Sequence, residues 1–341
     1  MKKMRVTLVM MAVLVLALGF FGCGGKGKAT ASNLFTLVPE NAAGVFHLDI
    51  KKLSTLEFYG KMIDELKNKE ATPGKQGEMI KNYQDFVNMT GIDPQKDLYA
   101  LVFAGFGDLN KKDIDFVMVA NLKYDQAKIM NLIKTAIQKE NKELAEETYQ
   151  DLILFKTKDE EGKDIVFSFI PPELIVLGRP GAVKQTIDIY KGKGKSMAAN
   201  KVAAPYIEDI AGEMGSFYVK LPDDVKKKQN AGMMEIDLTK AECMYGKVDY
   251  KSSAWVGEIQ MVCHNEAGNK QLVDAINGMK GMAAMAGPEF GELVAQINLT
   301  SSADAIKLTF SLTEELIKKL EKKVQEQKAA MPPPVVTEGT E

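Results

Sequence analysis

The chain has 341 residues and a formal net charge of −2 at pH 7, from 44 Lys and Arg against 46 Asp and Glu. This balance argues against a nucleic-acid-binding protein, which needs a basic surface for the phosphates. The two histidines, His47 and His264, exclude a three-histidine zinc site by count. The length suits one large domain or two of ordinary size.

The N-terminal segment predicts export and a lipid anchor. Three basic residues at the N-terminus precede an apolar run at residues 6–21, and Gly22 is the small residue before Cys23. This arrangement closely resembles the signal peptides of bacterial lipoproteins. The resemblance implies that residues 1–22 are removed and that the Cys23 thiol carries a diacylglycerol group at the mature N-terminus.

The same segment departs from the family pattern at Phe20 and Phe21, where Leu and a small residue are preferred. The alternative is an uncleaved membrane anchor, although the apolar run is short for a span. Either way the body is held at a membrane, and two acyl chains suffice for stable anchoring. Loss of residues 1–22 would remove three positive charges and take the net charge from −2 to −5. Since Gly24 is not the Asp of inner-membrane retention, the periplasmic face of the outer membrane is favoured.

Two segments flank the predicted folded body. Residues 23–34 are rich in Gly, Lys, Ser and Thr, which predicts a flexible tether. Residues 331–341 form a Pro-led tail that cannot continue a helix. Between them we expect a first module at residues 35–195 and a second, related module at residues 196–330.

The first module alternates strand patterns with helical ones. Asp125 is a good N-cap for a helix with one apolar face, made of Ile129, Met130, Ile133, Ala136 and Ile137. Pro180 and Gly181 open a short helix with Val183, Ile187 and Tyr190 expected inward. The predicted strands are residues 44–50, 100–104, 115–122, 152–157, 165–170 and 174–177.

The second module repeats this order. Residues 215–221 match residues 44–50 in Gly, Phe and apolar alternation, and a hairpin and a helix at about residues 267–286 follow. Strands are expected at residues 293–299 and 305–312. Thr313 then caps a last helix, with Leu316, Ile317, Leu320 and Val324 expected inward. Because strands come in consecutive pairs, we expect an α+β fold of antiparallel sheets with helices on one face, with a parallel doubly wound fold as the alternative.

Residues 35–49, FTLVPENAAGVFHLD, resemble the opening of a class of uncharacterised exported bacterial proteins with domains of unknown function. The matching positions are Val38, Pro39, Ala42, Val45 and Asp49. The resemblance extends loosely to residues 177–200. It implies the tandem α+β architecture and no activity.

Several motifs fall short of a catalytic or metal site. Gly194 to Ser196 end like a phosphate-binding loop, but the glycine five positions earlier is Ile189. Asp108, Asn110 and Asp113 lack the glycine of a calcium loop, which predicts a solvated turn. His47 alternates with Phe46 and Leu48, which predicts a polar sheet face around it. We therefore expect no enzyme, metal or cofactor, although a serine paired with a histidine is not disproved by the sequence.

The two cysteines of the predicted hairpin test its register. Pairing Tyr250 with Trp255 sets Met244 opposite Met261 and creates a coherent apolar face. This register puts Cys243 and Cys263 on opposite faces and predicts two free thiols.

Met279, Met282 and Met285 lie three residues apart in the second module. Thioethers suit Cu(I), but the helical spacing favours an ordinary core stripe. This stripe is made of Leu272, Ile276, Met279, Ala283 and Ala286. A third interpretation is an adaptable apolar groove for a lipid or a partner segment. The Lys-rich residues 226–228 and 318–323 fit a solvated surface better than a lipid-headgroup site, because acidic residues interleave the second group.

The sequence thus predicts a lipid-anchored cell-envelope protein with a non-catalytic binding or structural role. The alternatives are a carrier or sensor of an apolar ligand such as a lipid and, third, an enzyme of unknown class. Expected partners are the membrane, an envelope protein or an apolar ligand. A carrier would need a cavity of roughly a few hundred Å³.

Overall fold

The computed structural model describes residues 31–68, 83–109, 114–223, 226, 228–231, 234–285 and 287–330. The chain divides into two compact units, unit 1 up to Pro222 and unit 2 from Asp223 onward. The predicted signal peptide, Cys23 and the tail at residues 331–341 lie outside the described residues.

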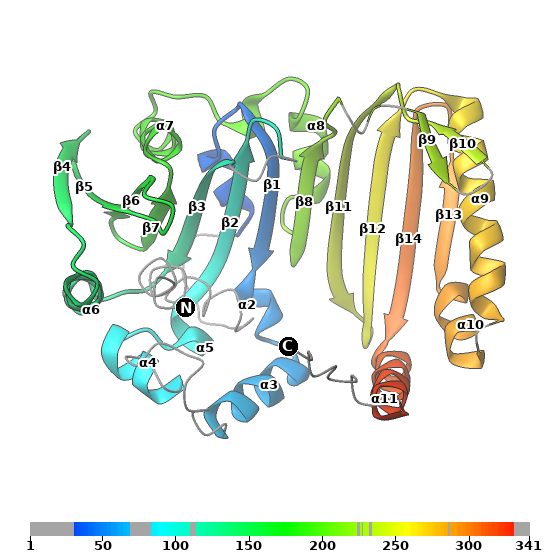
Figure 1. The fold of residues 1–341 in the computed structure, drawn as a ribbon, viewed down its shortest axis with the longest axis horizontal. Coiled ribbons are helices and arrows are strands. Elements are labelled where there is room, and N and C mark those ends of the chain that lie inside the picture. Colours follow the sequence, from blue (N-terminus) through cyan, green and yellow to red (C-terminus); the bar gives the residue numbers. More distant parts are fainter. Residues whose placement is uncertain are drawn as a thin grey trace, which may run out of the picture. The chain divides into compact units, whose positions relative to one another are not determined.

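Unit 1 is built on an antiparallel sheet with the strand order β8-β1-β2-β3-β7-β6-β5-β4 (Figure 1). All six predicted strands of the first module are present. The bounds are β1 Ala42–Asp49, β2 Leu98–Phe106, β3 Asp115–Leu122, β4 Ala145–Tyr149, β5 Leu152–Lys158, β6 Asp164–Ile170, β7 Leu174–Gly178 and β8 Gly215–Lys220.

The two helices predicted in the first module form as expected. In α6 (Gln126–Lys139) the Asp125 carboxylate accepts from the Lys128 amide, and every residue of the predicted apolar face is buried. Helix α7 (Pro180–Tyr190) packs against β3, β6 and β7 and buries Val183 and Ile187. Tyr190 was expected inward and is 40% exposed, because it lies in the last turn and its hydroxyl donates to the Pro171 carbonyl at the surface.

Unit 1 also contains short helical elements that the apolar periodicity did not indicate. The segment η1 packs against β1 and β2, α2 against β2, and α4 against α6. Their bounds are η1 Ala31–Leu37, α2 Ile50–Leu53, α3 Glu57–Asn68, α4 Tyr83–Thr90, α5 Pro94–Asp97, η2 Met197–Ala199 and α8 Ala204–Ile210.

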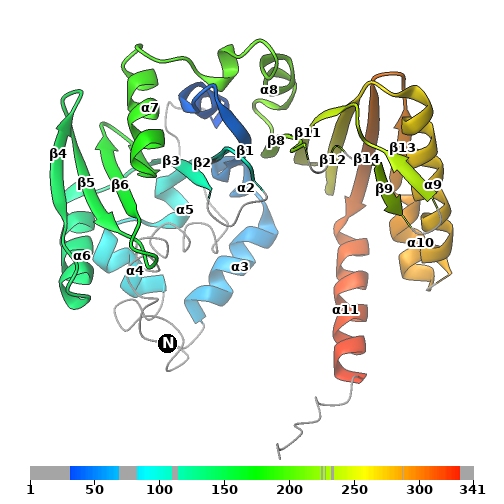
Figure 2. The ribbon, with the colours of Figure 1, turned by 45° about the horizontal axis from the view of Figure 1, so that its top comes forward.

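Unit 2 contains four antiparallel strands in the order β13-β14-β12-β11 and a separate pair, β9 with β10. Helices α9 and α10 pack against each other and against the β13–β14 side of these strands, and α11 continues from β14 (Figure 2). Val273 of α9 packs with Leu299 and Ile306 in the core. The bounds are β9 Lys228–Ala231, β10 Met234–Asp237, β11 Ala241–Lys251, β12 Ala254–Cys263, α9 Glu266–Ala284, α10 Pro288–Ala295, β13 Ile297–Ser301, β14 Ala305–Thr313 and α11 Glu314–Ala330.

The strand predicted at residues 293–299 is partly wrong. Helix α10 continues to Ala295, and the strand begins only at Ile297. Pro288 at the first helical turn favours the helix, so the apolar pair Leu293 and Val294 belongs to a helical face. The Thr313 cap is confirmed by its Oγ1, which accepts from the Leu316 amide at 3.3 Å, and Leu316 is buried.

The α+β class with antiparallel sheets is confirmed. The two units share an order of connections: β7 lies beside β3 after α6, and β14 lies beside β12 after α9. The predicted boundary after residue 195 differs from the contact boundary after Pro222, and β8 pairs with β1 within unit 1. Duplication of the two modules stays a prediction. Every helix within the described ranges is too short or too polar to cross a membrane.

Candidate functional site

The first histidine lies in the core of unit 1. His47 is fully buried, its ring centre is 5.2 Å from that of Phe35, and its Nδ1 is 3.4 Å from the Ser216 Oγ. Burial, aided by the charge of Lys52, lowers the pKa of His47 to about 4. The serine and histidine do meet, yet Ser216 is only 2% exposed, so no substrate reaches the pair.

The expectation that His47 lies on a polar sheet face is therefore wrong. Alternation along β1 does place His47 opposite to Phe46 and Leu48, as predicted. The face that carries His47 is covered by η1, which brings Phe35 against the imidazole. Alternation separates the two faces of a strand, but it does not predict which face another element will pack against and bury.

The opposite face of unit 1 carries two exposed phenylalanines. Phe46 is 45% exposed and Phe103 is 36% exposed, and each is the single exposed residue of its strand. The two are paired across β1 and β2, and Phe217 of β8 lies opposite Phe46. The Phe103 ring stacks on Phe116 with centroids 5.7 Å apart. We call Phe46, Phe103, Phe116 and Phe217 the phenylalanine row.

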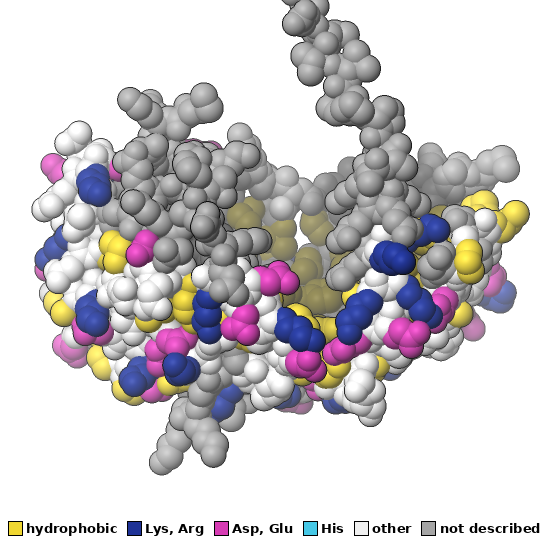
Figure 3. Space-filling view, turned by 90° about the horizontal axis from the view of Figure 1, so that it is seen from below, with side chains coloured by type: hydrophobic (Ala, Val, Ile, Leu, Met, Phe, Trp, Pro, Cys, Tyr) yellow, Lys and Arg dark blue, Asp and Glu magenta, His cyan; other side chains and the backbone are white. Residues whose placement is uncertain are grey.

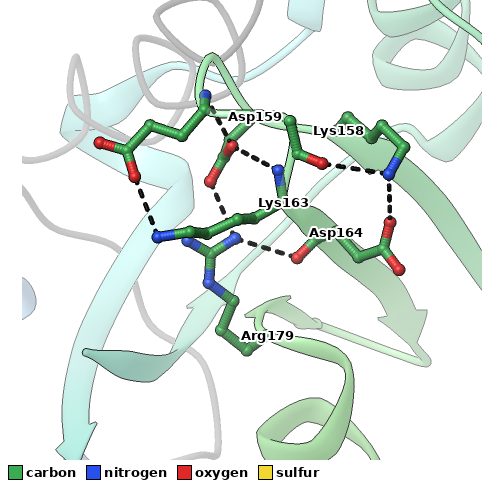
Figure 4. Close-up of polar contacts among 7 residues, drawn as sticks. Lys158, Asp159, Lys163, Asp164 and Arg179 are labelled. Carbon is green, nitrogen blue, oxygen red and sulfur yellow. Dashed lines mark hydrogen bonds and ion pairs between the residues drawn. The ribbon is translucent and has the colours of Figure 1, made fainter. Parts of the chain in front are cut away.

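A polar pocket of about 590 Å³ lies at one end of the unit 1 strands. It is formed where β2 ends, where β3 and β6 begin, and where α7 begins. Arg179, the residue before α7, is one of the lining residues, and Figure 4 shows its polar contacts. The complete lining is Phe106, Gly107, Asp108, Asp115, Lys163, Asp164, Arg179, Pro180 and Gly181.

Arg179 and Asp164 of the pocket lining are both held in ion pairs. Arg179 Nη1 lies 2.8 Å from Asp159 Oδ2 and donates to the Asp164 carbonyl at 3.0 Å, while the guanidinium lies over the Phe116 ring. The Asp164 carboxylate pairs with Lys156 at 2.6 Å and with Lys158 at 3.2 Å, and Figure 4 shows the contact with Lys158. The cluster joins the β5–β6 turn to the start of α7.

The pKa values fit a structural role for this cluster. Burial alone would raise the pKa of Asp159, but hydrogen bonds from the Lys163 amide and from Arg179 outweigh it and lower the pKa. The pKa of Asp164 is lowered by Lys156 and Lys158. Both carboxylates are therefore ionised at neutral pH, and neither is poised to transfer a proton. Sequence analysis missed the cluster, since its partners meet only through sheet pairing.

The three methionines lie on the second half of α9 and in the turn that ends it. Met279 is 51% exposed, Met282 66% and Met285 87%. The core-stripe interpretation is wrong for Met279, because the core of unit 2 takes its contacts from Val273, Leu272 and Ile276 in the first half of the helix. Ala286 lies outside the described residues. The apolar groove stays a prediction, and we call Met279, Met282 and Met285 the methionine ridge.

The predicted register of the cysteine hairpin is confirmed. Tyr250 pairs with Trp255 and Met244 with Met261, and the irregularity between Ala241 and Cys243 leaves Cys243 opposite Val262. Cys243 and Cys263 form no disulfide with each other, as predicted, and both are buried. Ser252 and Ser253 form the tight turn with φ of 52° and 61°, the mirror-image turn that suits a two-residue hairpin.

The remaining sequence motifs lie in surface contacts and turns rather than in a binding site. Lys318 pairs with Glu314, and Lys319 pairs with Glu292 and Glu315. On the face drawn in Figure 3, positive and negative side chains interleave. Gly194 follows α7, and the Lys195 carbonyl accepts from the Glu40 amide, which fits a structural turn. Asp108 lines the polar pocket, whereas Asn110 and Asp113 lie outside the described residues. No group of three His, Cys, Asp or Glu in the described part could hold a metal.

Comparisons with known proteins give structural likenesses but no family assignment. No protein-family model and no curated protein matches it. Crystal forms III, IV and I of TP0453 resemble it with TM-scores of 0.44, 0.42 and 0.42 at 8%, 10% and 10% identity. The matches cover 87%, 84% and 87% of this chain and 99%, 95% and 99% of those chains. At these scores the likeness carries no argument about function.

Proposed function

We propose that this chain is an exported, lipid-anchored envelope protein that works by binding rather than by catalysis. The phenylalanine row is the observation that carries the proposal. Apolar side chains in the middle of a sheet are normally covered, since each Å² left in water costs roughly 25 cal/mol. Phe46 and Phe103 break this pattern while their strand neighbours are buried. Exposed apolar patches of this kind are typical of binding surfaces.

The chemistry of the row favours an acyl chain as the bound group. Phe46 lies opposite Phe103, and Phe103 lies opposite the buried Met118. The exposed aromatic rings present flat, apolar and polarisable surface above the buried Met118, which suits a hydrocarbon chain. The predicted diacylglycerol at Cys23 would hold the body beside a membrane, where acyl chains are the abundant apolar ligand. A lipid carrier or sensor is therefore our specific form of the proposal.

The anchor is tested separately from the ligand. Cells that express the full chain are fed radiolabelled palmitate, and a Cys23→Ala variant is the control. The proposal expects label in the chain, loss of the label in the variant, and a faster-migrating mature form in the unmodified chain. An unlabelled chain of full length would support the uncleaved membrane anchor instead.

Ligand binding is tested on the body that begins at Gly24, purified without detergent. Its native mass is compared with its denatured mass, and extra mass is extracted into organic solvent. We expect bound lipid, and less of it in a Phe46→Ser/Phe103→Ser variant. Ile153 is 46% exposed on β5, away from the row, so Ile153→Ser is the matched control. A bare chain would overturn the lipid proposal and direct the search to envelope proteins.

A further inference from the structure

The methionine ridge has a property that core packing does not explain. Its three thioethers recur at i, i+3 and i+6, and each is at least half exposed. Burial of apolar area stabilises a fold in proportion to the area removed from water, so these side chains contribute little to the core. Core packing therefore does not account for the regular spacing.

The backbone keeps the three residues on one continuous helical path. Met279 and Met282 lie in α9, and the Met285 amide donates to the Met282 carbonyl at 3.1 Å, which extends the turn by one residue. Residues three apart on a helix have Cβ atoms about 5–6 Å from each other. At about 1.5 Å of rise per residue, Met279 and Met285 are roughly 9 Å apart along the axis with Met282 midway. Each flanking thioether is thus a neighbour of the central one.

The side chains have room to converge. A Cβ at Gly278 or at Gly281 would meet nothing within 4 Å, so open space flanks the methionines. Methionine has three rotatable bonds and an adaptable thioether. Two or three sulfurs can therefore approach one point above Met282 without displacing another side chain.

The ligand atoms that the ridge offers select a soft cation. Residues 275–287 contain no Asp, Glu, His or Cys, so carboxylate, imidazole and thiolate ligands are absent from this stretch. Lys280 is the single charged residue in this stretch, and its ammonium group donates a hydrogen bond to the Ile297 carbonyl. Hard cations such as Mg²⁺ and Ca²⁺ require oxygen ligands, whereas thioethers select Cu(I).

We propose that Met279, Met282 and Met285 form a surface site for Cu(I), ligated by two or three thioether sulfurs. Ag(I) is an equally soft monovalent ion that does not change oxidation state in air, and it serves as the probe. The proposal is independent of the phenylalanine row and of the lipid anchor, because it rests on α9 alone.

The test uses the full chain in detergent micelles, labelled with [methyl-13C]methionine. We expect Ag(I) to shift the methyl resonances of the two or three ligating methionines of the ridge, with a response that saturates at one ion bound there, and to leave the other methionines unchanged. A Met279→Leu/Met282→Leu/Met285→Leu variant assigns those resonances and removes the response. A chromophoric Cu(I) chelator, used without oxygen, should show at least a tenfold weaker affinity in this variant.

The control variant is Met244→Leu/Met261→Leu, which removes two half-buried thioethers from the same unit. Swaps of Met for Leu conserve volume, and the Trp255 fluorescence of unit 2 checks that each variant folds. The control should bind Cu(I) as the unmodified chain does. Unshifted ridge resonances would overturn the proposal. Unchanged Cu(I) affinity in the triple variant would also overturn it and would direct attention to the thiols.

Discussion

Helices α6 of unit 1 and α9 of unit 2 occupy the same place in the order of elements, after a hairpin and before further strands. Both carry an apolar stripe at helical spacing. In α6 the stripe is buried along the whole helix, whereas α9 buries Val273 and Ala275 in its first half and exposes Met279 and Met282 in its second. Periodicity thus identifies a helix and its apolar side, whereas packing of the neighbouring elements determines whether that side is buried.

We expect the largest loss of stability from substitution of a strand glycine, and each unit offers one such position. A Cβ at Gly178 of unit 1 would lie 2.2 Å from the Phe116 carbonyl oxygen and 2.8 Å from the Val117 Cα. These are backbone atoms, so Gly178→Ala must separate β3 from β7, and we expect a loss of about 3 kcal/mol or more. At Gly257 of unit 2 the nearest atom is the end of the Phe310 side chain, at 2.3 Å, which can rotate. Gly257→Ala should cost about 1–2 kcal/mol, and urea titration of both variants compares them.

Truncation of one methionine on each helix tests whether α6 and α9 differ in burial as described. Met130 of α6 is 8% exposed, and Met130→Ala leaves a cavity that should cost about 2–3 kcal/mol. Met282→Ala of α9 removes an exposed side chain and should change the free energy of unfolding by less than about 0.5 kcal/mol. Equal losses in chemical denaturation would mean that the second half of α9 is covered in solution.

The two histidines should give the units opposite responses to acid. His47 has a folded-state pKa of about 4, below its unfolded value, so the unfolded chain binds the proton first. Unit 1 should lose roughly 3 kcal/mol as the pH falls from about 6.5 to about 4. The pKa of His264 is raised by its hydrogen bond to Asp304, so its contribution is present at low pH and is lost as the pH rises through that pKa. Amide hydrogen exchange at several pH values separates the units, and His47→Leu should flatten the response of unit 1 alone.

Ion pairs differ between the units in their shielding from water. The Arg179 and Asp159 side chains are 13% and 10% exposed, and Arg179→Met leaves Asp159 a partly buried, unpaired carboxylate. We expect a loss of about 2 kcal/mol. Lys319 and Glu292 of unit 2 are 44% and 46% exposed, so Lys319→Met should cost less than about 0.5 kcal/mol. Thermal unfolding in low and high salt checks both, and a large salt effect on Arg179 would contradict its shielding.

The smallest expected effect is a gain in stability. Gly278 lies inside α9 where a Cβ meets open space. Gly278→Ala should stabilise unit 2 by about 0.5–1 kcal/mol, because alanine has the higher helix propensity. Trp255 is the single tryptophan of the chain, so its fluorescence reports the unfolding of unit 2. A loss of stability would show that the glycine is packed against another surface.

Local patterns predicted much of the fold. Period-two alternation located every first-module strand that was expected, and the helical stripe of α6 was correct at each of its five positions. The register of β11 with β12 was correct as well, because a one-residue slip would have mixed Lys247 with the apolar face. Where predictions were wrong, at Leu293, Tyr190 and Met279, short apolar runs and helix ends left more than one arrangement open.

Of the candidate sites, too, only part was predictable from local sequence patterns. The methionine ridge was visible as a spacing, yet its exposure was not, and the sequence analysis favoured a core instead. The phenylalanine row and the Arg179 cluster were not anticipated, because Phe46 meets Phe103 and Arg179 meets Asp159 only when separate strands pair. No local pattern carries that information.

By itself, the sequence determined the alternation of strands and helices, the capped starts of α6 and α11, the hairpin register and the free thiols. These features depend on residues close together in the chain, where propensity, capping and side-chain alternation act. The tertiary structure alone decided that His47 is buried while Phe46 is exposed, and that α9 leaves three methionines in water. Burial depends on which distant element covers a face, and that choice is made by the packing of the whole unit rather than by any one segment.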